Sequence, residues 1–455
     1  MSSLKVGFAK VEVNPQFGTP IAGYYQKRLM DGVLDPLYVI AVAFENQDNR
    51  AVLLSIDNVG IVKTEMDKLR AAVAERIGTV VDAVYAECTH SHTAPEVRLG
   101  SVLGGVYTED EVKKCSDYFA WLIAKACDAA SLAFQDLAPA KLSYTRGIAD
   151  KVSFIRRFRM PDGSVLTNPR ELYPETVGPA GEADETVQLL IVKRENAPEI
   201  GIVNFQVHPD VIGGCKISAD YPQFVRQTYE KLIDNSHCVY LNGTCGDTNH
   251  ADWSIWNTDK CFRGYDRARY MGRKIAMAAV ANYELAEPLN CDKIAFGNKA
   301  VMVKINKGTE EDLPLAAELT AYYNAHGLEE ATAYVQEKMG IADMVPAKTL
   351  LRRYLRIDSL KNAPDERELF VTALAIGDMV FAGIPGEPFT EVGRSIKNQS
   401  KFELTMPSCL ANGCEGYYPT QAAFDEGGYE AETAKYVAGT AEKLIEASVA
   451  LINSL

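Results

Sequence analysis

The residues that end the apolar runs of this chain constrain its fold most, and residues 80–92 show the pattern best. This run has the composition of a buried strand and closes on His90 and His92. Residues two apart on a strand point to the same face, so we expect both imidazoles to project together from the strand's end. Imidazole is the commonest metal ligand, so the pair predicts a metal site. The alternative is two histidines hydrogen-bonded in a turn, which the pair alone does not exclude.

A β-α-β unit is expected around this strand. Residues 50–57 are a continuous apolar run that ends in Asp57, and residues 64–77 have helical spacing before the histidine strand begins. In open sheets of this kind, sites lie beyond the carboxyl ends of the strands. Asp57 and His90 both fall at such ends, so the unit predicts a site at this edge.

Later strands show the same pattern, because each is followed closely by polar residues that can bind a metal ion or take part in catalysis. These strands and the residues after them are 201–207 with His208, 238–242 with Asp247, Asn249 and His250, and 379–384 with Glu387. Two hairpins are expected, one joining 187–193 to 201–207 and one turning at Gly377 and Asp378. Glu387 stands in a short segment between two prolines, which predicts a rigid turn at the strand's end.

The remaining elements are helices and one basic segment. A helix is expected over residues 108–137, which start with a capping-box pattern. A second helix is expected over residues 309–340, as a lid or outer layer, and a third over residues 431–455. Residues 153–159 contain Arg156, Arg157 and Arg159, and their pattern is that of a solvated basic edge strand.

One continuous domain is the favoured organisation. The length of 455 residues allows two to four domains. However, the sequence contains no linker rich in proline, glycine or serine, no internal repeat and no low-complexity tract. We therefore expect residues 1–455 to form a single mixed α/β domain, in which strands far apart in the sequence bring their ends together.

The net charge, the N-terminus and the cysteines indicate which partners and which cellular compartment to expect. A formal net charge of -14 disfavours nucleic acid and anionic membranes, which both need clustered Lys and Arg. The N-terminus shows no secretory signal, and no apolar run approaches the ~20 residues of a membrane span. The ten cysteines are scattered without a Cys-x-x-Cys pair, which is typical of reduced thiols. A cytoplasmic protein without membrane insertion is expected, and assembly into a homo-oligomer stays open.

Taken together, these stretches resemble the catalytic domain of the neutral/alkaline non-lysosomal ceramidases, in order and over nearly the whole chain. The resemblance begins at residues 7–15 and ends at residues 417–430. It implies a mixed α/β fold with mixed β-sheets flanked by helices, a bound Zn²⁺ and hydrolysis of an amide.

The resemblance also implies which residues hold the metal. The Thr-His-x-His segment supplies His90 as a ligand, and a Phe-x-x-His-Pro segment supplies His208. The Pro-Gly-Glu segment supplies Glu387. A tyrosine twelve residues before a Tyr-Glu pair matches Tyr417, although Tyr418 beside it is an alternative fourth ligand.

Other residues take roles in catalysis or substrate binding by the same resemblance. His92 is expected to move protons, while Tyr429 and either Arg156 or Arg157 stand around the substrate carbonyl. The polar residues expected beside the substrate or the attacking water are Asp247, Asn249, His250, Arg157 and Tyr418.

Two departures from the family pattern bear on the substrate. Asn249 stands where the family has its active-site serine, and it either donates an N–H to the substrate or caps a turn. The chain also ends before the family's C-terminal immunoglobulin-like domain. The sequence therefore predicts a zinc-dependent amide hydrolase acting on a small soluble molecule rather than ceramide. An ester or lactone hydrolase on the same zinc site, and an inactive binding homologue, are the alternatives.

Overall fold

Two mixed β-sheets form the centre of the fold, in a computed structural model that describes residues 4–97, 107–169, 175–252 and 263–455. In spatial order, the nine-stranded sheet contains β14 (Ser236–Asn242), β12 (Glu199–Phe205), β11 (Thr186–Arg194), β6 (Ala138–Ile148), β1 (Lys5–Glu12), β3 (Tyr38–Glu45), β4 (Arg50–Ile56) and β5 (Val84–Cys88), with β16 (Glu287–Leu289) beside β6. The four-stranded sheet contains β17 (Ile294–Lys304), β18 (Glu366–Ile376), β19 (Met379–Gly383) and β21 (Leu404–Ser408).

The two sheets pack face to face through a shared apolar core. Alternate residues along each strand point to one face, and the inward set of both sheets forms a single cluster of buried side chains. Phe381 of the small sheet lies between Phe44 and Tyr85 of the large one, with ring centroids 6.4 and 6.0 Å away. The mixed α/β class expected from the sequence is confirmed.

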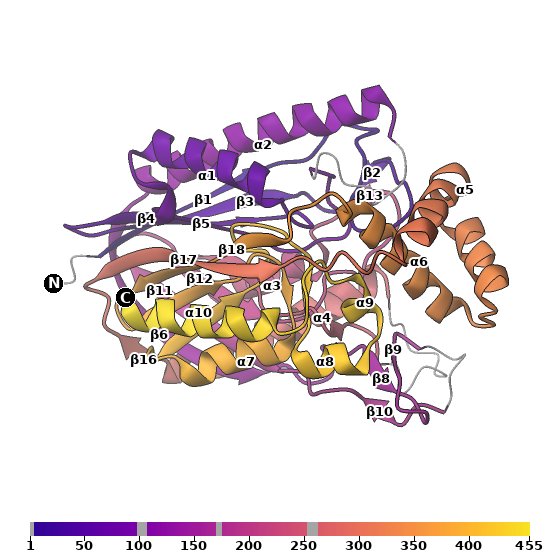
Figure 1. Ribbon diagram of the computed structural model, residues 1–455. Helices are drawn as coiled ribbons and strands as arrows, with labels where there is room; N and C mark the ends of the chain where they lie inside the picture. The colour runs from indigo at the N-terminus through magenta and orange to yellow at the C-terminus, as the bar shows by residue number, and fades with distance from the viewer. Residues whose placement is uncertain (1–3, 98–106, 170–174, 253–262) are drawn as a thin grey trace.

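Helices cover the outer face of each sheet, which gives four layers (Figure 1). The large sheet is covered by α1 (Lys63–Ile77) and α2 (Glu109–Gln135) over one half, and by α3 (Asp220–Leu232) and α4 (Tyr265–Val280) over the other. The small sheet is covered by α7 (Thr390–Gln399) and α10 (Thr440–Ser454).

The β-α-β unit and both hairpins predicted from the sequence are present. Strands β4 and β5 are parallel, with α1 as their connection. Strands β11 and β12 are antiparallel, as are β18 and β19 around Gly377 and Asp378. Helix α2 begins with the predicted capping box, in which Thr108 and Glu111 each bond the other's backbone N–H.

The C-terminal helix differs from the prediction. Residues 431–455 were expected as one helix, but the structure has α9 (Tyr429–Thr433) and α10, with an extended break that ends at Gly439. Gly439 has φ of 82°, which a helix interior does not allow. The periodic apolar positions therefore belong mainly to α10.

Helices α5 (Leu313–Met339) and α6 (Met344–Leu360) form a hairpin with an apolar core of its own. The hairpin lies at the end of the sandwich away from both termini (Figure 1). Its second helix contacts α9, and Tyr323 of α5 donates a hydrogen bond to the carbonyl of Tyr25 (2.9 Å). The helix predicted over residues 309–340 thus corresponds to α5, the first helix of this hairpin.

The basic segment is not a solvated edge strand, which corrects the sequence interpretation. It forms the short strands β7 (Phe154–Ile155) and β8 (Arg157–Arg159). Arg156 and Arg157 are buried, and only Arg159 lies at the surface. A buried arginine needs carboxylate or carbonyl partners, and both have them in the C-terminal part of the chain.

Several short β-ladders are separate from the two main sheets. They are β2 (Gly32–Val33) with β13 (Lys216–Ile217), β15 (Thr248–Asn249) with β7, β9 (Val165–Thr167) and β10 (Gly178–Pro179) with β8, and β20 (Glu387–Pro388) with β22 (Tyr417–Tyr418). Helix α8 (Gln421–Glu426) follows β22. Within the described part of the chain, no helix is both long and apolar enough to cross a membrane.

A buried ion pair joins the large sheet to α3. Asp57 follows β4 and accepts two hydrogen bonds from the guanidinium of Arg226, at 2.9 and 2.8 Å. It also accepts hydrogen bonds from the backbone N–H of Tyr38 and from the hydroxyl of Thr89, the residue before His90. The pair therefore fixes the end of β4 next to the segment that carries the histidines.

We predict that Arg226→Leu lowers the free energy of unfolding by about 3–5 kcal/mol, because it leaves the Asp57 carboxylate buried without its counter-ion. Urea denaturation of the purified variant measures the change. The double variant Asp57→Asn, Arg226→Leu removes both charges and should recover part of the loss. A single variant as stable as wild type would contradict this role for the pair.

Candidate metal centre

His90 and His92 lie beyond the end of β5, which stops at Cys88. His90 has φ of 72°, a left-handed conformation that non-glycine residues rarely adopt, and its N–H donates to the carbonyl of Asn58 (2.8 Å). The prediction that both imidazoles point the same way because of strand alternation is therefore wrong in its reason. The chain turns sharply at His90, and the turn brings the two rings together.

His208 and Glu387 reach the same place from other strands. His208 follows β12 of the large sheet, and Glu387 begins β20, just after β19 of the small sheet. Within β20, Glu387 pairs in parallel with Tyr417 of β22. The two sheets thus each supply a polar residue where their strands end.

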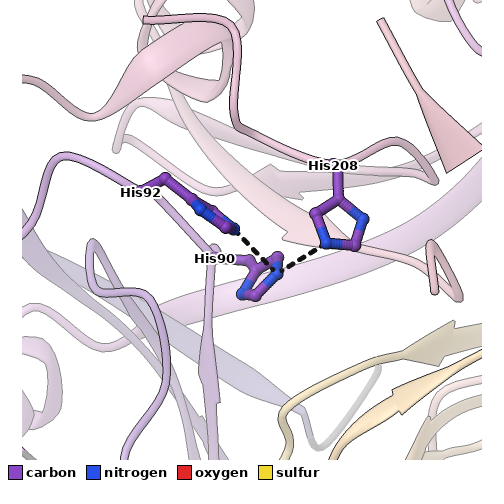
Figure 2. Close-up of side chains that lie close together, drawn as sticks. All are labelled: His90, His92 and His208. Atoms are coloured by element: carbon purple, nitrogen blue, oxygen red, sulfur yellow. Dashed lines mark hydrogen bonds between the residues drawn. The ribbon is translucent and has the colours of Figure 1, made fainter. Parts of the chain in front are cut away.

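The imidazoles of His90, His92 and His208 point toward one another (Figure 2), and the Glu387 carboxylate lies beside two of them. Nε2 of His90 lies 3.1 Å from Nε2 of His208. Oε2 of Glu387 lies 3.3 Å from the first nitrogen and 3.2 Å from the second. Ligands about 2.0–2.1 Å from a tetrahedral zinc ion are separated by about 3.3 Å, so these three atoms have the spacing of one face of such a site.

Backbone carbonyls determine how the two imidazoles face that point. Nδ1 of His90 bonds the carbonyl of Val59 (2.6 Å), and Nδ1 of His208 bonds the carbonyl of Cys245 (2.8 Å). A carbonyl only accepts, so each Nδ1 donates its N–H and each ring turns its Nε2 to the centre, where a metal ion can bind it. Oε2 of Glu387 is buried, and no described residue donates a hydrogen bond to it. Three electron-rich atoms in mutual contact fit a cation between them.

The charges of the group agree with that fit. Burial alone would raise the pKa of Glu387, but His90 and His208 outweigh it and hold this pKa well below the usual range. Burial and Arg156 act to lower the pKa of His208, yet Cys245 and Glu387 prevail and raise it to about 10. Without a metal ion, His208 is thus protonated, and its positive charge lies beside the Glu387 carboxylate.

His92 completes a group of three histidines that can hold a metal ion. Its Nε2 lies 3.3 Å from Nε2 of His90, and the ligand atoms of His90, His92 and His208 all lie within 4.8 Å of one another. Burial, followed by the neighbouring histidines, holds the pKa of His92 well below its ordinary value. A neutral His92 can accept a proton beside the metal.

An N-terminal loop packs on His92 and was not foreseen from the sequence. Nδ1 of His92 is buried without a hydrogen bond and lies 3.9 Å from Oδ1 of Asp210, which in turn accepts a hydrogen bond from the Tyr24 hydroxyl. The guanidinium of Arg28 donates to the carbonyl of His92 (2.7 Å) and lies over the Tyr24 ring. Asp210 stands two residues after His208, so a carboxylate beside a predicted ligand was the available signal.

Gly23 makes this packing geometrically possible. Its φ is 102°, and a Cβ placed there would lie 2.8 Å from Nδ1 of His92. Any other residue would push the imidazole away from the centre.

The two adjacent tyrosines occupy different environments. The Tyr417 ring lies 6.4 Å from His208 and 5.6 Å from Tyr429, between centroids. The ring of Tyr418 packs beside Tyr436 in the core of the small sheet, and its hydroxyl donates to the carbonyl of Pro385 (3.1 Å). Tyr417 is therefore the tyrosine beside the candidate metal ligands, and Tyr418 is placed in the core.

The two adjacent arginines are also distinguished. Arg156 lies with Cζ 5.3 Å from the Tyr417 ring centroid, and it donates to Glu430 (2.7 Å) and to the carbonyl of Gly246 (2.7 Å). Arg157 instead donates to the carbonyl of Gly427 (2.8 Å) and pairs with Glu426, which ties β8 to the C-terminal segment. Only Arg156 faces the candidate centre.

The loop after β14 supports the Glu387 segment. Oδ1 of Asp247 accepts hydrogen bonds from both the N–H and the hydroxyl of Thr390, each at 2.8 Å, rather than from a histidine. The N–H of Gly246 donates to the carbonyl of Pro388 (2.9 Å). These bonds fix the turn between β20 and α7, so the structure gives Asp247 a positioning contact.

Asn249 and His250 are both buried. The Asn249 amide donates to Asn168 (3.2 Å) and accepts from the N–H of Ala251 (3.1 Å), so it caps a turn. Burial, with Arg263 and Arg267, holds the pKa of His250 well below its ordinary value, and neither of its ring nitrogens has a hydrogen-bond partner among the described residues.

Comparison with known proteins identifies the fold. No family model and no curated protein matches the chain. The neutral ceramidase from Pseudomonas aeruginosa matches 100% of this chain and 75% of its own, with 16% identity and a TM-score of 0.74. A ceramidase complexed with C2 matches 100% and 76%, with 16% identity and a TM-score of 0.70. The chain has the mixed α/β fold of the neutral ceramidase catalytic domain, as the sequence predicted.

We predict that metal binding releases a proton from His208. Because its pKa of about 10 keeps the metal-free residue protonated below that pH, Zn²⁺ must displace the proton. At pH 6, below the pKa of about 7 of a zinc-bound water, titration calorimetry in buffers of different ionisation enthalpy should show about one proton released per ion. His326→Ala, in an exposed histidine of α5, should match wild type. Binding without proton release would contradict the protonated His208.

Proposed function

We propose that the protein is a zinc-dependent hydrolase that cleaves the amide bond of a small molecule. The observation that carries this proposal is the triangle of His90 Nε2, His208 Nε2 and Glu387 Oε2, with sides of 3.1–3.3 Å, at the strand ends of a ceramidase fold. Tyr417, which pairs with Glu387 across β20 and β22, is the proposed fourth ligand. Two imidazoles, a carboxylate and a phenol form a donor set that suits Zn²⁺.

A bound zinc ion supplies a water with a pKa of about 7 and polarises the substrate carbonyl. The chain's own residues then move protons and bind the oxygen. His92 is the proposed acid–base group, because its buried, neutral imidazole adjoins His90. Asp210 positions His92, since its carboxylate is the acidic group that faces Nδ1.

The proposed donors to the carbonyl oxygen are Arg156 and Tyr429, which flank Tyr417 on two sides. Glu430 orients the Arg156 guanidinium through the 2.7 Å hydrogen bond. A single donor of this kind contributes roughly 3 kcal/mol to stabilising the transition state. His250, buried with both ring nitrogens unpartnered, is proposed to contact the substrate.

Asn249 is not a nucleophile, so the proposed reaction forms no acyl-enzyme at that position. Its amide is engaged within its own loop, which supports the structural alternative for this residue over a contact with the substrate. Hydrolysis of an ester or lactone is the second candidate, because the same metal and proton chemistry serves both bonds.

The proposal treats residues 1–455 as one catalytic domain, because its proposed ligands are spread from His90 to Tyr417 and come from both sheets. The scattered cysteines favour the cytoplasm. The net charge of -14 favours a small-molecule substrate over nucleic acid, and homo-oligomer formation stays open.

We predict about one zinc ion per chain in the purified protein, and loss of the ion in His90→Ala, His208→Ala and Glu387→Gln. Each of these changes removes one corner of the ligand triangle. Elemental analysis measures the content, and His326→Ala is the matched control because this histidine is exposed on α5. Full zinc content in the three site variants would reject the ligand assignment.

We predict that the enzyme turns over N-acyl amides faster than esters of the same acyl group, relative to their uncatalysed rates, and that chelation stops both reactions. His92→Ala should slow the chemical step about 10²- to 10⁴-fold with zinc retained, because it removes a positioned acid–base group. Quenched-flow kinetics and intact-mass spectrometry provide the readout. A burst of product with an acyl adduct on the protein would overturn direct attack by water.

A further inference from the structure

Arg352 of α6 connects the two segments that border the candidate centre. Its Cζ lies 4.4 Å from the ring centroid of Tyr25 and 5.0 Å from that of Tyr429. Tyr25 continues the N-terminal loop that packs on His92 through Tyr24, whose ring centroid is 5.7 Å from that of His92. Tyr429 contacts Tyr417 on the other side of the centre. The guanidinium therefore stands where these two segments meet the helical hairpin.

Arg352 has no ion pair with an acidic residue in the described part of the chain, whereas Arg28, which packs on His92, has its guanidinium engaged by backbone carbonyls. The Nε of Arg352 is buried and has no acceptor. The buried arginines Arg156, Arg157 and Arg226 each pair with a carboxylate. Its neighbour Arg353 is also paired, with Asp312 at 3.6 Å and Glu432 at 3.4 Å. Asp312 and Glu432 are thus already engaged by Arg353.

The carboxylates of the centre are also engaged. Glu387 faces His90 and His208, and Asp210 accepts from Tyr24. The faces of the two tyrosine rings beside Arg352 interact with its positive charge. A guanidinium has five in-plane N–H donors, whose geometry matches a carboxylate. Arg352 consequently offers an unfilled binding position for an anion next to the proposed site.

We propose that Arg352 binds an anionic group of the substrate, and that the substrate is a carboxylate-bearing amide such as an N-acyl amino acid. This inference rests on the proposed function, since it assigns the substrate class of the same site. The metal ligands hold the reacting carbonyl, and Arg352 holds the charged end across Tyr429. Neutral amides lack the group that Arg352 recognises and are poorer substrates.

The test compares charged substrates with neutral substrates of the same shape. The first pair is N-butanoyl-glycine and N-butanoyl-glycinamide, in which only the first compound has a carboxylate on the amine side of the amide bond. The second pair is N-ethylsuccinamate and its primary amide, in which only the first compound has a carboxylate on the acyl side. Wild type should prefer the carboxylate of at least one pair by about 10- to 100-fold in kcat/KM, the range of a charged hydrogen-bonded contact. Equal kcat/KM within both pairs would overturn the inference.

Variants of Arg352 assign the preference to this residue. Arg352→Gln should abolish the difference in kcat/KM between the charged substrate and its neutral twin, mainly by raising KM for the charged substrate. Arg352→Lys keeps the charge but not the planar fork, and should retain part of the preference. The matched control Arg353→Gln should behave as wild type. If Arg352→Gln reduces turnover of both twins equally, Arg352 is structural and the inference fails.

Equilibrium binding separates this inference from the proposed function. If wild type cleaves none of the four amides, amide hydrolysis is rejected, and calorimetry of the same compounds decides the role of Arg352. Tighter binding of the carboxylates that is lost in Arg352→Gln supports the anion site. Equal binding of charged and neutral twins overturns it.

Discussion

Two backbone carbonyls, those of Val59 and Cys245, determine what the centre of this protein can bind. Each accepts a hydrogen bond from Nδ1 of a histidine, and so turns the opposite nitrogen toward Glu387. Without these contacts the rings could flip and present a proton to one another, which would remove the attraction for a metal ion. Both carbonyls belong to loops after strands of the large sheet, so the ligand geometry follows from the sheet.

The surrounding fold keeps those loops in place. Asp57, paired with Arg226, contacts Thr89 and thereby holds the start of the histidine turn. Asp247, bound to Thr390, holds the turn after Glu387. His90 keeps a left-handed φ that costs of order 1–3 kcal/mol, and such strain persists where neighbouring structure enforces it. Buried polar contacts around the centre therefore act on the backbone as much as on the ligands.

The sequence predicted the strands and their chemical ends because apolar runs that stop at polar residues are a local signal. His90, His208 and Glu387 were found in this way, and the structure brings them together. Local signals could not reveal that the chain turns at His90, because the left-handed φ of a non-glycine residue cannot be predicted from residue composition. Nor could they separate Tyr417 from Tyr418, since that choice depends on strand register.

Contacts between distant segments were also beyond sequence reasoning. Arg156 and Arg157 looked solvated because their carboxylate partners lie more than 260 residues away, in the C-terminal segment. Asp210 and Tyr24 were missed for the same reason, since their contact joins the N-terminal loop to the strand end at His208.

The origin of the ligands in two sheets links metal loading to the order in which the chain is made. His90 and His208 belong to the large sheet, whereas Glu387 arrives only with the small sheet, which is completed by β21. During synthesis, the two histidines leave the ribosome long before their carboxylate partner. A centre that uses all three proposed ligands therefore requires both sheets, so an ion bound by all three would report that the two sheets have packed together.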